Sequence, residues 1–166
     1  MEPKYWMVLI TGLIPLIIGS AWYSPALFGK TWMKVSDTSE EKVRSGNMLV
    51  IFGSVYIFGV LISLMMAQVA IHQNAIYGLF ATAPDFQNAT SEMSKTFNNL
   101  MTNYGDRHRS FGHGAVHGAF TTVLLIFPII AIVALFERRG WKYIFLHSGY
   151  WLVTLILISG VLCHFM

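Results

Sequence analysis

The stretch MLVIFGSVYIFGVLISLMMAQVAI, residues 48–71, decides the fold class of this chain. It holds no charged side chain and is longer than the roughly 20 apolar residues with which an α-helix crosses a hydrocarbon core about 30 Å thick. Lipid offers the backbone no hydrogen-bond partners, so a run of this length must satisfy its own N–H and C=O groups as a helix. The stretch is therefore a predicted membrane-spanning helix.

Three further apolar runs accompany it, at residues 5–28, 113–136 and 143–165. They leave no room for a separate soluble domain of ordinary size. Of the 166 residues 55% are hydrophobic and 11% charged, whereas soluble proteins have roughly 25% charged residues. We therefore expect an all-α integral membrane protein, a four-helix bundle that forms a single domain over residues 1–166 within the lipid bilayer.

The longest connection, residues 72–112, is predicted to be partly helical. Its apolar side chains recur at helical spacing, which predicts an amphipathic helix at about residues 91–104. The residues of this stripe are Met93, Phe97, Leu100, Met101 and Tyr104. Such a helix is expected to rest on the membrane surface or to cover the end of the bundle.

Basic side chains set the predicted topology. Most of the 11 Lys and Arg residues lie in residues 29–47 and 137–142, the two connections on one side of the bundle. The positive-inside rule then makes these connections cytoplasmic and leaves both termini and residues 72–112 on the extracytoplasmic side. The basic residues stand at the ends of apolar runs and form no nucleic-acid-binding patch, so no nucleic acid is expected as a partner.

Small residues and prolines shape the predicted helices. Small side chains let helices approach closely in lipid, where apolar burial gives no driving force. The expected packing residues are Gly59, Ser63, Ala67, Gly12 and Gly19. Pro15 and Pro128 lack a backbone donor, so each is predicted to kink its helix.

The most suggestive polar residues enter the third apolar run. His113 and His117 are spaced i, i+4 and share a helix face, with Ser110 and Thr121 about one turn away on either side. This polar stripe has three interpretations: hydrogen bonding between helices, proton or polar-substrate handling, and metal ligation. A metal site would draw further ligands from the same side, from His108, His72 or His164. Apart from such a metal, no cofactor is expected.

A second polar set is predicted at the opposite membrane face. His147 lies about one turn inside the last apolar run, on the same face as Tyr150. A polar side chain at that depth needs a partner. Tyr23, Glu137 or Ser24 is placed to supply it. The set is either an interhelical hydrogen bond or a ligand site.

Four segments of the sequence look like a known family. They are WYSPALFGKTW at 22–32, GAVHG at 114–118, LFERR at 135–139 and GYWLV at 149–153. Together they resemble the DUF1761 family of bacterial membrane proteins over nearly the whole chain. The resemblance implies a four-helix protein of the bacterial inner (cytoplasmic) membrane, and it brings no assigned activity and no catalytic residues.

Three functions remain open at this level. The favoured one is a small homo-oligomeric channel or transporter-like protein with a histidine-lined polar face. The second is an accessory or structural subunit that binds another membrane protein through its small-residue face. The third is a membrane metal-binding protein or enzyme that uses His113 and His117. No catalytic residue is identified, so a role without catalysis is favoured.

Overall fold

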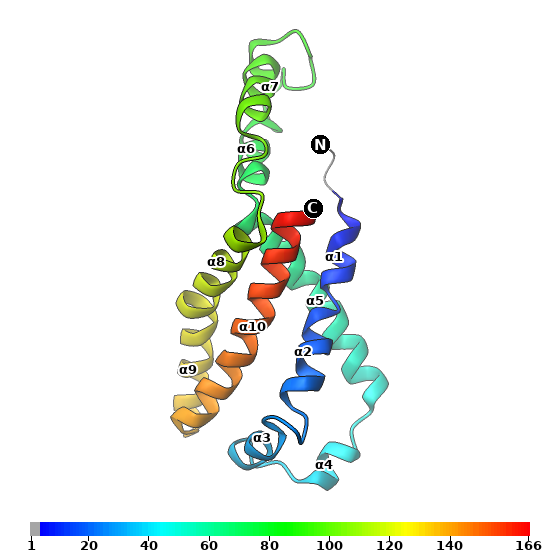
Figure 1. Cartoon of the computed structure of the whole chain (residues 1–166), viewed down its shortest axis with the longest axis vertical. Helices are drawn as coiled ribbons and strands as arrows, with labels where there is room; N and C mark the ends of the chain where they lie inside the picture. Colours follow the sequence, from blue (N-terminus) through cyan, green and yellow to red (C-terminus); the bar gives the residue numbers. More distant parts are fainter. Residues whose placement is uncertain (1–3) are drawn as a thin grey trace.

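The computed structural model describes residues 4–166 as helices and connecting turns, with no strand in that range. In chain order the helices are α1 (Trp6–Thr11), α2 (Ile14–Trp22), α3 (Gly29–Val35), α4 (Glu40–Arg44), α5 (Met48–Ala70), α6 (His72–Phe80), α7 (Glu92–Tyr104), α8 (Phe111–Thr121), a π-helical turn (Thr122–Ile126), α9 (Phe127–Phe136) and α10 (Trp141–Phe165). The long helices lie along one axis, with the α6–α7 hairpin at one end and α3 and α4 at the other (Figure 1).

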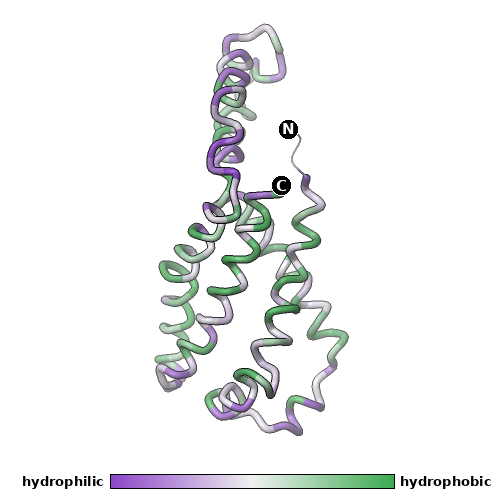
Figure 2. The backbone as a smooth tube through the Cα atoms, viewed as in Figure 1, coloured by the Kyte–Doolittle hydropathy of each residue, from purple (hydrophilic) through white to green (hydrophobic). Residues whose placement is uncertain are grey.

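Within residues 4–166, three helices are long and apolar enough to cross a membrane. They are α5, the continuous rod Phe111–Phe136 formed by α8, the π-helical turn and α9, and α10. The first apolar helical stretch, Trp6–Trp22, is shorter. The outward faces are apolar, as at Leu49, which is 85% exposed. Figure 2 shows hydrophobic residues along the long helices and hydrophilic ones toward both ends. The chain is thus a helical membrane protein.

Helix α10 forms the centre of the bundle. It packs against α8, α5, α9, α2 and α1. Its fully buried apolar side chains are Ile144, Leu155, Ile158 and Leu162. The last three join Met7 of α1 and Met66 of α5 in one core cluster.

The first apolar run is interrupted, although we expected one kinked helix over residues 5–28. The chain leaves regular helix between α1 and α2, at Gly12 and Leu13. Pro15 has no N–H to donate to the carbonyl of Thr11 four residues earlier, so the break falls one turn before the proline. Within α1, the side-chain hydroxyl of Thr11 donates to the Met7 carbonyl at 2.9 Å.

The run also ends earlier than expected. Helix α2 stops at Trp22, and Ser24 precedes Pro25, a position at which α-helical backbone is disfavoured. The following turn closes with a 2.8 Å hydrogen bond from the Gly29 N–H to the Ser24 carbonyl. Residues 23–28 therefore lead into α3 instead of extending the helix.

The third apolar run contains a π-helical turn that its sequence pattern does not predict. It occupies Thr122–Ile126, directly before Pro128 in the first turn of α9. Pro128 cannot donate to the carbonyl of Leu124, and a widened turn is a common way for a helix to absorb such a lost bond. The sequence predicts a kink at Pro128, and the structure has a π-helical turn directly before this residue.

The first stretch and α5 approach each other at glycines. A Cβ atom on Gly59 would collide with the carbonyl oxygen of Gly12, and one on Gly12 would lie 2.6 Å from Cγ2 of Val60. Ser63 and Ala67 are buried further along the same face of α5. These contacts leave no room for larger side chains where the two elements cross.

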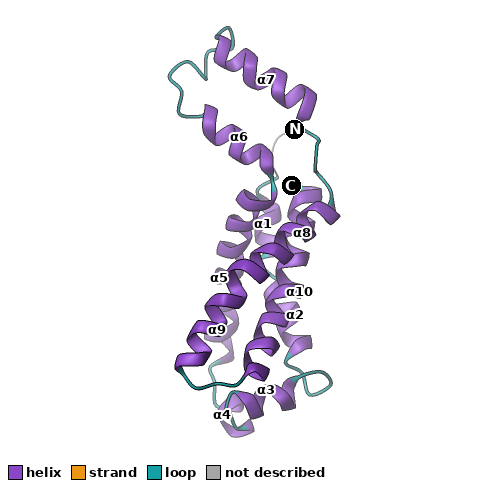
Figure 3. Cartoon of the chain, turned by 90° about the vertical axis from the view of Figure 1, so that its left-hand side faces the viewer, coloured by secondary structure: helices purple, strands orange, loops and turns teal. Residues whose placement is uncertain are grey.

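The α6–α7 hairpin has a small aromatic core of its own. Phe86 and Phe97 lie 5.1 Å apart between ring centroids, and Tyr77 and Phe80 pack around them. Helix α7 begins after Ser91, whose side chain accepts a hydrogen bond from the Ser94 N–H. Figure 3 shows the hairpin projecting beyond the bundle instead of folding over its end.

Candidate metal centre

Helix α8 is held tightly against α10 through two glycines. A Cβ on Gly114 would collide with the carbonyl oxygen of Ser159, and one on Gly118 would collide with that of Leu155. Only a residue without a side chain allows this approach of two backbones. Each glycine directly follows a histidine in the sequence. The seam with α10 therefore fixes the direction in which those two histidines project.

The start of α8 is equally well defined. Ser110 has extended backbone, and its side chain accepts a hydrogen bond from the His113 N–H at 3.2 Å. This is an N-cap, which satisfies one of the donors left free in the first helical turn. The residue predicted as part of a polar stripe thus sets the beginning of the helix that carries His113 and His117.

The third histidine comes from the break between α5 and α6. Ile71 has extended backbone (φ −106°, ψ 95°), so the chain changes direction and α6 begins at His72. The Asn74 side chain donates at 3.1 Å to the Ala67 carbonyl, which also accepts from the Ile71 N–H, and so ties the start of α6 to the end of α5. Because α5 also packs against α8, the break brings His72 next to the histidines of α8.

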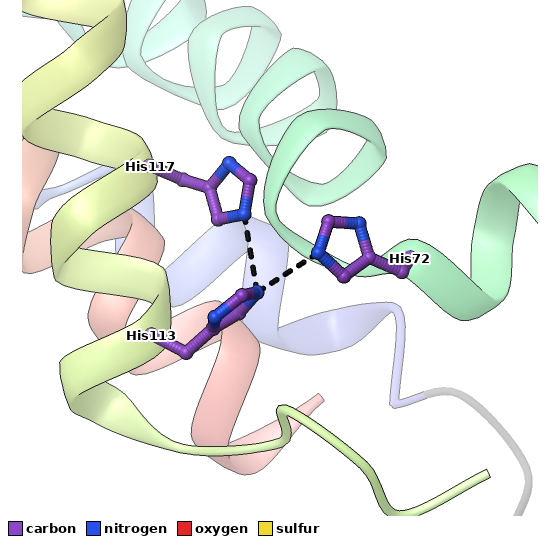
Figure 4. Close-up of side chains that lie close together, drawn as sticks. All are labelled: His72, His113 and His117. Atoms are coloured by element: carbon purple, nitrogen blue, oxygen red, sulfur yellow. Dashed lines mark hydrogen bonds between the residues drawn. The ribbon is translucent and has the colours of Figure 1, made fainter. Parts of the chain in front are cut away.

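The three imidazoles converge on one point. Nε2 of His113 lies 3.0 Å from Nε2 of His72 and 3.1 Å from Nε2 of His117. One ligand atom from each of the three residues lies within 4.8 Å of the other two. Figure 4 shows the rings directed toward one another, two from α8 and one from the start of α6.

Hydrogen bonding between neutral imidazoles does not account for this arrangement. The Nε2 atom of a neutral imidazole either carries one hydrogen or offers one lone pair. His113 Nε2 therefore satisfies one neighbouring nitrogen and leaves the other contact, at about the same distance, without a favourable partner. A cation at the point of convergence would instead accept a lone pair from all three nitrogens.

The spacing suits a transition-metal ion. Zinc binds imidazole nitrogen at about 2.0–2.1 Å in tetrahedral geometry, so two such nitrogens lie about 3.3 Å apart. The two shortest contacts here, 3.0 and 3.1 Å, differ from that spacing by a few tenths of an ångström. Three imidazoles are also a ligand set typical of zinc, copper or nickel. His72 is exposed and the other two are partly buried, so an ion has a path to the site.

Three more residues are predicted from the sequence to lie near this site: Thr121, His108 and His164. Thr121 is the last residue of α8. His108 lies beside the group, with its ring centroid 4.7 Å from that of His113. His164 packs edge-on against Phe165 near the end of α10 and is not a member of the histidine group.

At the opposite end of the bundle, Tyr23 is the partner of His147. The Tyr23 hydroxyl lies 2.9 Å from His147 Nδ1. Burial, together with the nearby Tyr150 and Tyr143, raises the pKa of Tyr23, so the hydroxyl stays protonated and is available as a donor. The Tyr150 hydroxyl donates to the Pro15 carbonyl at 2.9 Å. The two tyrosines thereby link α10 to α2 and the turn that follows it.

Glu137, the other predicted partner, does not pair with His147. It follows α9, and its carboxylate lies 3.9 Å from Nε of Arg139. Gly19, predicted as a packing residue, faces the ring of Tyr150, which would lie 3.6 Å from an added Cβ. Glu137 therefore pairs within its own loop, and Gly19 lies against the side chain of Tyr150 on α10.

Comparison with known proteins gives one match. A family model described as "Protein of unknown function (DUF1761)" matches residues 6–163, nearly the whole chain. Neither a curated protein nor a solved structure matches the chain. The geometry of the histidine group is therefore the main guide to function.

Proposed function

The chain belongs to the DUF1761 family, whose function is unknown, and we propose that it is a membrane protein that binds a divalent transition-metal ion through His72, His113 and His117. The observation that carries this proposal is the contact of one nitrogen, His113 Nε2, with two others at 3.0 and 3.1 Å. A metal ion satisfies all three lone pairs, and hydrogen bonds satisfy at most one of the two contacts.

The proposal includes four membrane spans. Trp6–Trp22 holds 17 residues, about 25 Å of helix if unbroken, which is at the lower limit for a span. It packs alongside α5 and α10, and aromatic residues stand at both its ends, as is common at membrane interfaces. We therefore place α1 and α2 in the bilayer as one interrupted span.

The proposed orientation puts the histidine group on the extracytoplasmic side of a bacterial inner membrane. The Lys4 N–H donates to the Met166 carbonyl at 3.2 Å, so the two ends of the described chain are adjacent. Figure 1 has them at the end that carries the α6–α7 hairpin, while the two basic connections lie at the other end. With the basic end cytoplasmic, the metal site faces outward.

Reversible binding suits the site better than hydrolysis. Zinc metalloproteases with the H-E-x-x-H motif pair the metal-bound water with an acidic general base. Among residues 4–166, no carboxylate belongs to the ligand group. A partly exposed site of three neutral ligands is instead suited to capturing and releasing an ion at the membrane surface.

Metal analysis of untagged protein tests the proposal. Protein purified from membranes without a polyhistidine tag or chelator should contain about one zinc, copper or nickel ion per chain. His117→Gln should reduce this content to near zero, because it removes the most deeply placed of the three ligands. His164→Gln is the matched control, since its ring lies outside the group, and should keep the wild-type content. Metal-free wild-type protein that also takes up no added metal would refute the proposal.

A further inference from the structure

We infer that His108 supplies the fourth ligand of this centre when the metal is bound, so that four imidazoles close the site. The inference rests on the proposed function, since it concerns the coordination of the same ion. It assigns a role to a loop residue that lies outside the group of three converging nitrogens.

The backbone of His108 is held in an unusual conformation. Its φ is 62°, in the left-handed region that non-glycine residues rarely adopt. Strain of this kind persists where the surroundings fix it, and it is concentrated at ligand-binding and functional sites. Asp37 and Arg138 share this conformation, so the ligand role of His108 rests on its position beside the other rings and on the contacts that hold its backbone there.

Contacts from three parts of the chain hold His108 in place. Its carbonyl accepts hydrogen bonds from the Ser110 N–H at 3.0 Å and from Sγ of Cys163, on α10, at 3.1 Å. The preceding Arg107 carbonyl accepts from Nε2 of Gln73, at the start of α6, at 2.9 Å. The elements that carry or support the other three histidines thus also position this loop.

The His108 ring lies beside the converging rings, at the distance expected of a fellow ligand from one of them, His113. Imidazoles that share one tetrahedral zinc ion have ring centroids about 5 Å apart. The three converging rings are separated by 4.6 to 5.0 Å. His108 lies 4.7 Å from His113 and 5.9 Å from His72. Its nitrogens lie outside the converging group, so the proposal requires the His108 side chain to turn toward the site when the metal binds.

A fourth imidazole changes what the site can do. Three ligands leave a position for water, as in catalytic zinc sites, whereas four protein ligands close the coordination sphere. Here three ligands come from helix positions next to the packed bundle, and the fourth comes from an exposed loop. The loop ligand is the one that can leave first, so metal would enter and depart on the side of His108.

X-ray absorption at the zinc edge tests the inference. Untagged protein in lipid nanodiscs, stripped with a chelator and reloaded with zinc, should show four imidazole nitrogens and no oxygen ligand. His108→Ala should show three imidazoles and one oxygen, with zinc affinity reduced more than tenfold, since even outer-shell partners of a metal cost about 10–100-fold. His164→Ala should match the wild type in both measurements.

The outcomes separate the two proposals. Three imidazoles and an oxygen in the wild type, unchanged by His108→Ala, would overturn the role of His108 and leave the three-histidine centre intact. No zinc bound to the wild type would overturn both. The wild-type count needs no substitution, so the result does not depend on how well a variant folds.

Discussion

At the scale of single residues, His113 determines the chemistry of the histidine group. Its Nε2 contacts both other nitrogens, whereas His72 and His117 each supply one contact to it. Its position is fixed twice, by the N-cap of Ser110 and by the glycine that follows it in the seam with α10. Such positioning of a ligand before metal arrives reduces the ordering that binding must impose.

Protons should compete with the metal for these nitrogens. An imidazole binds metal only when neutral, and the unperturbed pKa of histidine is about 6.5. Protonation of the ligands should therefore weaken zinc binding as the pH falls below neutral. A competition titration with a zinc-sensitive dye at falling pH measures the change. An affinity independent of pH would show that the histidines are not the ligands.

The tyrosine and histidine pair at the other end should contribute to stability alone. Tyr23→Phe removes the hydroxyl that lies 2.9 Å from His147 Nδ1 and leaves a partly buried nitrogen without its partner. The free energy of unfolding in detergent should fall by about 1–3 kcal/mol, with zinc affinity unchanged. Tyr77→Phe is the control, because its side chain is exposed on the hairpin. Equal stability of Tyr23→Phe and wild type would contradict the assignment.

At the scale of helices, the seam between α8 and α10 links helix packing to the position of the histidine group. Gly118→Ala places a methyl group against the Leu155 carbonyl, so the helices must separate. We expect a loss of about 1–3 kcal/mol in unfolding free energy, as for other overpacked contacts, and weaker zinc binding because His117 moves with the helix.

Gly112→Ala is the matched control on the same helix. An added Cβ there meets no atom within 4 Å, and alanine favours helix over glycine by up to about 1 kcal/mol. Thermal unfolding with and without zinc measures both variants. If Gly118→Ala were as stable as Gly112→Ala, the close seam would not exist.

Features that depend on local sequence can be predicted, and features that depend on how helices cross cannot. Length and apolar composition predict helices because lipid permits few alternatives, and residues 4–166 are helical, with three helices long and apolar enough to cross a membrane. The i, i+4 spacing of His113 and His117 indicates a shared face because helix geometry is local. The approach of His72 depends on the break at Ile71 and on how α5 crosses α8, which no local pattern encodes. Of the further ligands that the sequence left open, the structure brings His72 into the group.

Irregular turns are the other feature that the sequence does not predict. Pro15 and Pro128 predict that regular helix is disturbed near them, because each lacks a backbone donor. They do not predict which residues take the irregular conformation. In the structure the irregular backbone lies before each proline, at Gly12 and Leu13 in the first stretch and at Thr122–Ile126 in the third. The choice depends on packing, since Gly12 is also where α5 comes closest.

At the scale of the whole molecule, the orientation in the membrane is open to a direct test. Gln87→Cys places a thiol on the hairpin and Glu41→Cys places one on α4, both at exposed positions. A membrane-impermeant maleimide should label the first in intact cells and the second only after lysis. The native Cys163 is buried, so the background should be low. The reverse pattern would place the metal centre on the cytoplasmic side.

The channel or transporter predicted from the sequence, and its homo-oligomeric state, remain predictions. The same holds for an accessory role with a membrane-protein partner. A metal site at one end of the bundle is compatible with transport, for which it would be an entry point. Zinc uptake by liposomes that contain the purified protein is the corresponding measurement, and no uptake at any zinc concentration would exclude transport and leave the binding site unaffected.

The most direct test of the central claim is a calorimetric zinc titration of chelator-stripped, untagged protein, comparing wild type with His72→Gln. His72 is the decisive position because only the three-dimensional structure brings it to the histidines of α8. We expect about one zinc ion per wild-type chain and an affinity at least about 100-fold lower for His72→Gln, since loss of a direct ligand should cost at least as much as loss of an outer-shell partner. Equal affinities for the two proteins, or no binding by the wild type, would contradict the account.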